Sequence, residues 1–556
     1  MLRSRLVLSV LPLLVLVTQT AAAQRALGLG DDASTLPLGA MRVSAGVLWD
    51  RANERYDANG KLWPLGANAS AASWNGLYDP RLATATPLVT TLSGLAAFDA
   101  SLGALKVGRR DGSADAIVGL ELGLLSRVTV GARLTVASHA IEPAVTLNPG
   151  RIEGTVGLNP AWSNSVARDR NTLLVTQFDS AVAQTNRRIA ACQATPTASG
   201  CAPIVANVAM AQSLVANATA FAAALNQLYG GRKNSTGLPF VPVANGAAQQ
   251  AIDQRVLGYR DQFAALGNAV IGTQGPAAAA LLSPADLTAM LSDSLYGYQL
   301  RPIRTVHAYG LGDVSVHVKV RLYQTTGDDT ASIHGFAVRQ SAAATLRVSG
   351  GNTPAADEPF APMTGSGSGG FSAQSFTDLF YGNRLSASVV VGLDQGSAQA
   401  YAMRLPSATS PAVGGVPFPL VPASRTIQLS RTPGARLDIA VTPRVALTPS
   451  IWLGARWELS QQAEDRWTSK SSATATTDAA TVTDTQTWAA GTDWSAQQFT
   501  IGGTYSTVQA AHDHRARYAF DVTYEHQETM TGSGWRVPHL TRDVVTVRWY
   551  RRLWGR

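Results

Sequence analysis

The sequence predicts an all-β fold, a transmembrane antiparallel up-and-down β-barrel of about 12 strands (roughly 10–14), with a large α-helical insert in an outer loop. Three observations lead to this prediction. A secretory leader opens the chain, apolar and polar residues alternate in many separate segments, and one long Ala-rich region changes to helical spacing. Barrel strands that cross a membrane alternate between an apolar side that faces lipid and a side that faces the polar lumen.

Residues 1–23 are predicted to be a signal peptide. Arg3 and Arg5 form a basic start, residues 6–17 are an apolar core, and Ala21-Ala22-Ala23 before Gln24 suits signal peptidase. The alternative, a membrane anchor, needs about 20 apolar residues, and this run is shorter. We therefore expect an exported protein that is cleaved after the three alanines.

The clearest strand runs from Val314 to Leu322, where apolar residues occupy every second position and polar residues lie between them. A period of two is the pattern of a strand with one apolar face and one polar face. A single strand of this kind fits a soluble β-sandwich as well as a membrane barrel. The number of such strands, and what precedes them, distinguishes the two folds.

Residues 24–140 are expected to hold the first barrel strands. Strands are predicted at 41–49, 116–124 and 128–136, and the last two form a hairpin across the tight turn 125–127. Between 57 and 103 the chain is polar and Ala-rich. A short helix is expected there after Asp79-Pro80, where Asp caps the helix and Pro takes its first turn.

Residues 141–307 are expected to form a helical extracellular insert. Apolar residues recur at helical spacing over 174–189, 208–225 and 252–266, and Ser283-Pro284 marks a further helix start. The only two cysteines, Cys192 and Cys201, lie between the first two of these helices. In an exported chain, such a pair closing a short loop is expected to form a disulfide. Because the apolar faces are thin, we expect the insert to pack on something larger, where it could cap or partly fill the lumen.

Residues 308–556 are expected to supply the remaining strands. The alternating segments are 308–323, 336–348, 385–393 with a weak partner at 398–405, 435–441, 445–459, 499–505, 516–525 and 545–550. Two further regions are predicted to be loops from their composition: the Gly/Ser/Pro-rich residues 350–382 and the Thr/Ala/Ser-rich residues 466–495.

The connections between predicted strands separate into a short and a long set. If both termini lie in the periplasm, the short connections all fall on the inner side: 125–127, 325–332, 394–396, 442–444 and 509–514. The long ones all fall outside: 57–103, 141–307, 350–383, 406–424 and 461–495. Short inner turns and long outer loops are typical of outer-membrane barrels.

Several short motifs resemble one broad group of bacterial barrels. Gly310-Leu311-Gly312-Asp313 opens a strand that ends at Lys319-Val320-Arg321-Leu322-Tyr323, Leu125-Ser126-Arg127 precedes another, and the late hairpin surrounds Thr442-Pro443-Arg444. The group is the phenol-degradation-pathway transporters of the outer membrane, which are similar in turn to the hydrophobic-substrate uptake channels. The resemblance covers roughly residues 100–140 and 305–556. It implies a channel for small hydrophobic or aromatic molecules, with outer-membrane lipid and the barrel-assembly machinery as partners.

The end of the chain departs from this group. The usual aromatic last residue is absent, because Trp554 is followed by Gly555-Arg556, although Trp549 and Tyr550 lie close by. The expected assembly signal is therefore weakened without being removed.

Charged residues on the polar faces of the strands are the candidate lumen lining. The predicted cations are Arg42, Arg133, Lys319, Arg321, Arg339, Arg347, Arg436, Arg456, Arg517 and Arg548, and the predicted acids are Glu121, Asp438, Glu458, Asp521 and Glu525. One interpretation is a lumen that attracts anions, as basic rings do in pores. The other is that arginine–carboxylate pairs across neighbouring strands simply satisfy a polar interior.

Other chemistry has weaker support in the sequence. His512-Asp513-His514 has zinc- or copper-ligand residue types, but it falls in a predicted turn, so we expect no metal and no cofactor. No serine and histidine spacing indicates a hydrolase, and we expect no enzyme. The net charge of +8 comes from arginines that alternate with apolar residues, which argues against nucleic acid.

Two functional hypotheses follow for a protein of the bacterial outer membrane. The first is a channel or uptake protein for small, hydrophobic or aromatic, molecules. The second is a structural or surface-interaction barrel, plugged by its helical insert, that transports nothing. A channel needs a continuous polar path past the insert, whereas a plug would bury the Ala-rich helix faces against the inward arginines.

Overall fold

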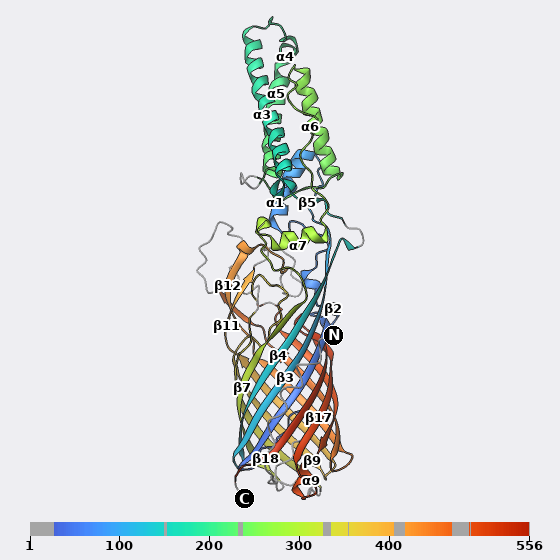
Figure 1. Cartoon of the computed structure of the whole chain (residues 1–556), viewed down its shortest axis with the longest axis vertical. Coiled ribbons are helices and arrows are strands. Elements are labelled where there is room, and N and C mark those ends of the chain that lie inside the picture. Colours follow the sequence, from blue (N-terminus) through green and yellow to red (C-terminus); the bar gives the residue numbers. More distant parts are fainter. Residues whose placement is uncertain are drawn as a thin grey trace.

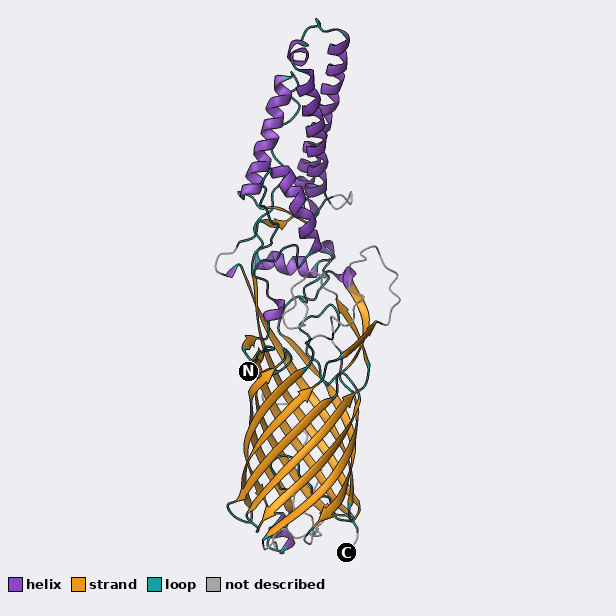
Figure 2. Cartoon of the chain, turned by 180° about the vertical axis from the view of Figure 1, so that it is seen from behind, coloured by secondary structure: helices purple, strands orange, loops and turns teal. Residues whose placement is uncertain are grey.

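A computed structural model describes residues 27–149, 153–231, 237–325, 335–353, 355–404, 418–469, 489 and 491–554. The chain forms a closed antiparallel β-barrel of twelve strands with a helical bundle standing on one end (Figures 1 and 2). We call the end where the first strand begins and the last strand ends the inner end. The opposite end, which carries the helices, is the outer end. The predicted fold class is confirmed.

Each barrel strand pairs with its neighbours in sequence order, and β18 pairs back with β1 to close the barrel. The strands are β1 (Ala40–Tyr56), β3 (Leu105–Leu125), β4 (Val128–Leu147), β7 (Val306–Gln324), β8 (Phe336–Val348), β9 (Gly370–Tyr381), β10 (Leu385–Gly396), β13 (Arg436–Ala446), β14 (Ile451–Gln462), β16 (Trp494–Ser506), β17 (Ala519–Ser533) and β18 (Pro538–Arg552). A short strand, β2 (Leu62–Pro64), pairs with the outer end of β1.

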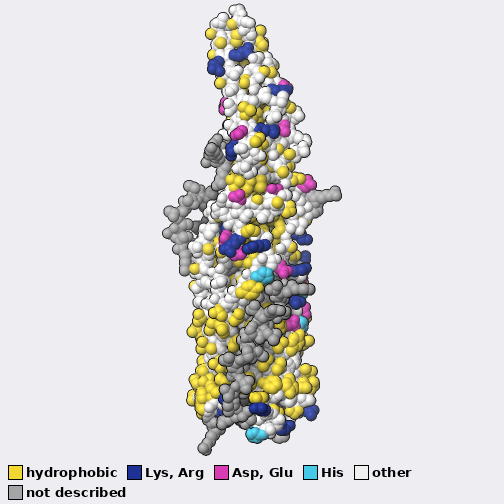
Figure 3. Space-filling view, in the orientation of Figure 1, with side chains coloured by type: hydrophobic (Ala, Val, Ile, Leu, Met, Phe, Trp, Pro, Cys, Tyr) yellow, Lys and Arg dark blue, Asp and Glu magenta, His cyan; other side chains and the backbone are white. Residues whose placement is uncertain are grey.

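The alternation in the sequence becomes two faces of one wall. On β10, Leu385 and Leu393 are 48% and 54% exposed on the outside of the barrel, whereas Ser388 on the inside is fully buried. Other strands repeat this arrangement, and Figure 3 shows hydrophobic side chains gathered over the barrel exterior. An apolar exterior around a polar interior is the arrangement that lipid contact requires.

Two predictions about individual strands were wrong, and they cancelled in the strand count. The stretch 370–381 was predicted to be a loop but forms the barrel strand β9. The stretch 398–405 was predicted to be a barrel strand but lies outside the barrel sheet. That stretch contains β11 (Gln399–Arg404), which pairs with β12 (Thr426–Thr432) in a separate sheet completed by β15 (Arg466–Ser469). The sequence of β9 does not alternate between polar and apolar residues, because its outward face carries Ser375 and Thr377 while its inward face carries two phenylalanines.

The predicted inner turns 394–396 and 442–444 are also corrected. Residues 394–396 end β10 at the outer end, and β13 continues through Pro443 to Ala446 before turning at 447–450. Pairing between β13 and β14 is interrupted beside Pro443, whose nitrogen has no hydrogen to donate. The inner turn after Leu125 is confirmed, and the predicted turn 509–514 contains the short helix α9 (Val508–His512). The predicted turn 325–332 lies mostly outside the described residues.

The helical bundle is built from two outer connections. Its long helices are α3 (Ser165–Ala194), α5 (Val208–Tyr229) and α6 (Ala247–Ala265), and α1 (Pro80–Ser93) packs against α5 and α6 from the connection that follows β2. Shorter elements complete it: α2 (Pro160–Ser163), α4 (Ala202–Ala206), α7 (Pro284–Ser292), β5 (Val156–Leu158) and β6 (Phe240–Pro242). Asp79 caps α1, and Ser283 and Asp286 form a reciprocal cap on α7, so both predicted helix starts are confirmed.

The bundle stands away from the barrel and does not enter the lumen (Figure 1). Its buried core continues down to Leu105, Val107 and Ile141 at the outer ends of β3 and β4. By length and composition α5 could cross a membrane, but its apolar residues, such as Phe221 and Leu225, are buried against the other helices. Strand β4 extends to Leu147, so the insert begins later than the predicted residue 141.

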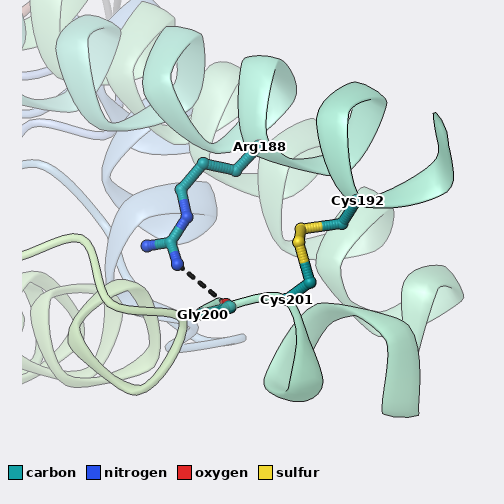
Figure 4. The surroundings of a disulfide bond; sticks show 4 residues. All are labelled: Arg188, Cys192, Gly200 and Cys201. Atoms are coloured by element: carbon teal, nitrogen blue, oxygen red, sulfur yellow. Dashed lines mark hydrogen bonds between the residues drawn. A yellow bond between two sulfur atoms is a disulfide. The ribbon is translucent and has the colours of Figure 1, made fainter. Parts of the chain in front are cut away.

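A disulfide joins Cys192 at the end of α3 to Cys201 at the start of α4, as the sequence predicts (Figure 4). Beside it, the Arg188 guanidinium donates hydrogen bonds to the carbonyl oxygens of Gly200 at 3.0 Å and Gly267 at 2.8 Å. The tip of the bundle is therefore tied together by one covalent bond and one cation that bridges two loops.

Replacing both cysteines with serine should loosen the tip without affecting the barrel. A disulfide that closes so short a loop stabilises by about 2–3 kcal/mol, chiefly by restricting the unfolded chain. We expect faster amide hydrogen exchange over residues 195–206 and unchanged heat-modifiable migration of the barrel on gels. Unchanged exchange at the tip would contradict this prediction.

Candidate functional site

The residues before β1 lie inside the barrel. We name residues 27–39 the plug segment, because Leu27, Leu29 and Leu36 are each only 2% exposed within the inner part of the lumen. The sequence assigned this stretch to the first barrel strands, but it belongs to no strand. Its neighbours are inward-facing side chains from strands on opposite sides of the wall.

Wall side chains satisfy the backbone of the plug segment. The amides of Ala33 and Leu36 donate to Asp378 on β9 at 2.9 Å and to Thr129 on β4 at 2.7 Å. Other wall side chains donate to its carbonyl oxygens: Arg444 of β13 to Leu29, Arg548 of β18 to Gly28 and Lys319 of β7 to Asp32. An extended segment without strand partners needs such bonds to bury its backbone. Side chains thus hold most of the plug segment, and at its end the main chain of Gly39 bonds to Gly123 and Leu553 of the wall.

Apolar contacts also hold the segment: Leu27 packs with Ala337 and Phe380, Leu36 packs near Val508, and Leu29 fits a notch in the wall. Leu29 packs against two inward glycines that face each other across β14 and β16, Gly454 and Gly502. A Cβ added at these positions would lie 2.9 Å and 2.6 Å from the Leu29 methyl groups. The two glycines therefore form a notch that admits the leucine side chain and would exclude it if either carried a larger residue.

A buried ion pair lies at the centre of the contacts. Arg339 on β8 and Asp378 on β9 are 2% and 0% exposed, and the guanidinium donates to one carboxylate oxygen at 2.7 Å and 2.9 Å. Asp378 also accepts from Ser388 at 2.6 Å and from the Ala33 amide. Because the carboxylate is fully engaged, removing it would leave a buried cation without compensation.

The plug segment also brings two carboxylates to the wall cations. Asp32 accepts hydrogen bonds from Ser34 and from the amide of Leu27. Burial by itself would raise the pKa of Asp32, but Arg339 and Lys319 lower that pKa below its ordinary value. Asp31 is exposed to the lumen above and faces Arg133 and Arg456. The segment thus supplies negative charge to wall cations, of which Arg339 and Arg456 also pair with wall carboxylates and Lys319 and Arg133 form no ion pair with a described wall residue.

Above the plug segment the wall charges are paired and partly exposed. Arg542 and Asp50 are 32% and 17% exposed in a bidentate pair, whereas the Arg339–Asp378 pair is almost fully buried. Arg456 pairs with Glu458 at 2.6 Å. The inner part of the lumen is therefore filled, and the part above it is accessible to water.

The structure brings most predicted lining residues onto the inner face of the wall. Three sets can be distinguished by their height in the lumen. The plug segment is surrounded by Arg42, Glu121, Lys319, Arg339, Asp521, Glu525 and Arg548, and beside Asp31 lie Arg133 and Arg456. Above the segment lie Arg347, Arg436, Asp438 and Glu458. Two of the predicted lining residues, Arg321 and Arg517, do not lie in the lumen beside or above the plug segment. Arg321 reaches the inner turn, where it donates to the Ser126 carbonyl, and Arg517 is exposed before β17 with its guanidinium over Tyr518.

Sequence reasoning placed Lys319, Arg339 and Arg548 in the lumen but missed the other residues that hold the plug segment. Asp31 and Asp32 lie in a stretch with no periodic pattern, Asp378 was in a predicted loop, and Arg444 was in a predicted turn. Of these residues, only Arg444 could have been assigned to the lumen from the sequence. The alternation of polar and apolar residues in β13 continues through Arg444 if a strand is allowed to contain Pro443.

The histidines do not form a metal centre in the described part of the chain, where no three His, Cys, Asp or Glu side chains gather around one point. His512 ends α9 and lies 3.5 Å from the Asp513 carboxylate next to it. His317 faces the lumen, 3.4 Å from Glu121, and His307 stacks with Tyr309. His334 lies outside the described residues.

No known family model matches the chain, and no curated protein matches it in sequence. Solved structures with a similar trace include an outer-membrane channel of Pseudomonas putida F1, at 8% identity and a TM-score of 0.40 over 94% of this chain and 98% of that one. A Pseudomonas aeruginosa FadL homologue matches at 8% identity and 0.27, over 97% and 99% of the two chains. The Pseudomonas putida toluene transporter TodX matches at 10% identity and 0.23, also over 97% and 99%. These are proteins of the kind that the sequence motifs resemble, and the argument for a channel below rests on the lumen.

Leu29→Ala should unseat the plug segment, whereas Leu38→Ala should not. Truncating a buried leucine costs about 2–5 kcal/mol, but Leu38 is 42% exposed in the same segment and gains little from burial. We expect a higher open fraction in planar-bilayer recordings for the first variant only. Equal currents from the two variants would show that the glycine notch does not hold the segment.

Asp378→Asn should destabilise the barrel by about 3–5 kcal/mol, because the buried Arg339 guanidinium loses the carboxylate that it is hydrogen-bonded to, with only the more distant Asp32 left as a counter-charge. Asp394→Asn is the matched control. Its carboxylate pairs with Arg347 but is 26% exposed, so we expect a loss of at most about 1 kcal/mol. Urea unfolding from lipid vesicles measures both, and similar midpoints would contradict the prediction.

Proposed function

We propose that this protein is a bacterial outer-membrane channel for small molecules whose inner opening is closed by its own residues 27–39. The observation that supports this most directly is the division of the lumen. Its inner part is filled by a segment without strand pairing, and its outer part is lined by hydrated charged pairs. A purely structural barrel has no need of a polar path that ends at a separable segment.

The proposed location follows from the chain and the wall together. A signal peptide at residues 1–23 would export the protein, and an exterior of exposed apolar residues around a closed barrel needs a membrane. The connections at the inner end are short, and those at the outer end are long except for residues 534–537 between β17 and β18. The inner end would therefore face the periplasm and the helical bundle the outside of the cell.

The cargo proposed from the resemblance is hydrophobic or aromatic. Proteins named for such cargo are among the structures with a similar trace, including the toluene transporter. Weak, non-specific contact with the lumen would suit passive passage, because cargo must also leave.

Ionic selectivity should depend on the plug segment. Wall cations Arg444, Arg548 and Lys319 bind its carbonyl oxygens, and Asp31 lies among others. With the segment in place, these positive charges are neutralised or covered. Without it, they would face the lumen and favour anions.

The alternative of a barrel plugged by its helical insert is less well supported. The described helices of the insert pack on one another and on α1, and they stand above the barrel (Figure 2). The Ala-rich helix faces are not buried against the inward arginines.

Bilayer conductance of three refolded proteins tests the proposal: the intact chain, a variant lacking residues 27–36, and one lacking residues 165–265. We expect small or intermittent current from the intact chain, large anion-preferring current without the plug segment, and little change without the helices. Current that appears only when the helices are removed would support the insert as the plug. Silence in all three, from protein that migrates as a folded barrel, would exclude a channel.

A further inference from the structure

Two cations on the outside of the barrel lack the partners that lumen cations have. Arg51 on β1 and Arg110 on β3 follow the outward-facing alternation of their strands and are exposed. Arg51 pairs in register with Gly112, so Arg110, two residues further toward the outer end, lies diagonally beside it. Neither forms an ion pair with any described residue, whereas Arg42, Arg339, Arg456 and Arg542 inside the wall each do.

These cations adjoin a groove on the barrel exterior. Trp49, Arg51, Thr541 and Asp543 line it, where β1 pairs with β18. Directly below, toward the inner end, lie the outward-facing pair Val47 and Val545. The groove therefore has an apolar lower end, an aromatic ring and a positive upper end. Tryptophan with arginine just beyond it is the arrangement found where hydrocarbon meets head groups.

The carboxylates near the groove are already engaged. Asp543 accepts hydrogen bonds from the Tyr524 hydroxyl and pairs with His526, both at 2.8 Å. Further out, His539 lies between Glu54 at 4.0 Å and Glu528 at 3.5 Å. Glu142 is opposite Arg110 in the register of β3 and β4, but no ion pair joins them. Arg51 lies near the Asp543 carboxylate without pairing with it, so the guanidinium donors of Arg51 and Arg110 remain able to bind an external anion.

We propose that this surface binds a phosphorylated glycolipid of the outer leaflet, with its phosphates on Arg51 and Arg110 and an acyl chain along Val47 and Val545. Guanidinium groups suit phosphate because they present paired donors. Lys106, exposed on the same face of β3, extends the positive surface outward. The inference rests on the outer-membrane location proposed above but not on channel activity.

Native mass spectrometry of the full-length detergent-solubilised protein can test this, with bisphosphorylated lipid A and dephosphorylated lipid A as probes. The test variant is Arg51→Ala with Arg110→Ala. The matched control is Arg187→Ala with Arg304→Ala, which removes two exposed arginines, on α3 and just before β7, that also lack ion pairs among the described residues. We expect at least about a tenfold loss of affinity for bisphosphorylated lipid A in the test variant and little change in the control.

Three results would overturn the proposal: equal binding of dephosphorylated lipid A, unchanged affinity in the test variant, or an equal loss in the control. Arg51→Lys with Arg110→Lys guards against a folding artefact, since it keeps the charge but not the paired donors and should bind more tightly than the alanine variant and less tightly than the unaltered protein. Conductance is recorded on the same preparations. A protein that conducts but ignores lipid A would refute only the lipid site, and one that binds lipid A without conducting would refute only the channel.

Discussion

The pairing of β18 with β1 is the constraint on which the rest of the structure depends. In hydrocarbon no strand edge can remain unpaired, so the sheet must close. Closure places Ala40 opposite Arg552 and fixes where β1 begins, at the inner end of the barrel. The residues just before Ala40 must then leave the barrel or turn into it. Because the wall offers unpaired donors and acceptors inside, they turn in.

The wall and the plug segment complete one another electrostatically. Higher in the lumen, arginines and carboxylates on neighbouring strands pair directly, as Arg542 does with Asp50. Around the plug segment the wall has more cations than it pairs, and the backbone carbonyl groups of the segment and its two aspartates take up the remainder. Such a segment is held by bonds that lumen water could replace, whereas a paired strand is held by its ladder. This difference makes it the separable part of the lumen.

The helical bundle is a second structural unit, with an apolar core that lies outside the barrel lumen. Its helices bury thin apolar faces against each other and against α1, which comes from a different connection. The core then continues into the extended ends of β3 and β4, so the bundle is anchored to the wall without occupying the lumen. The insert was expected to pack on something larger, but its helices pack mainly on one another and on the shorter helix α1, and only the base of their core reaches these strand ends.

The sequence by itself determined the elements whose pattern is local. Alternation identified most barrel strands, helical spacing identified α3, α5 and α6, and cap residues identified the starts of α1 and α7. Tertiary structure decided the rest. The strand β9 carries apolar residues on both faces because Phe376 and Phe380 pack inward, which no period of two can reveal. The plug segment has no period at all: Arg444 reaches Leu29 across 415 residues and Arg548 reaches Gly28 across 520. Its position depends on side chains from strands that come together only when the barrel closes. The periodicity of a sequence cannot predict such long-range contacts.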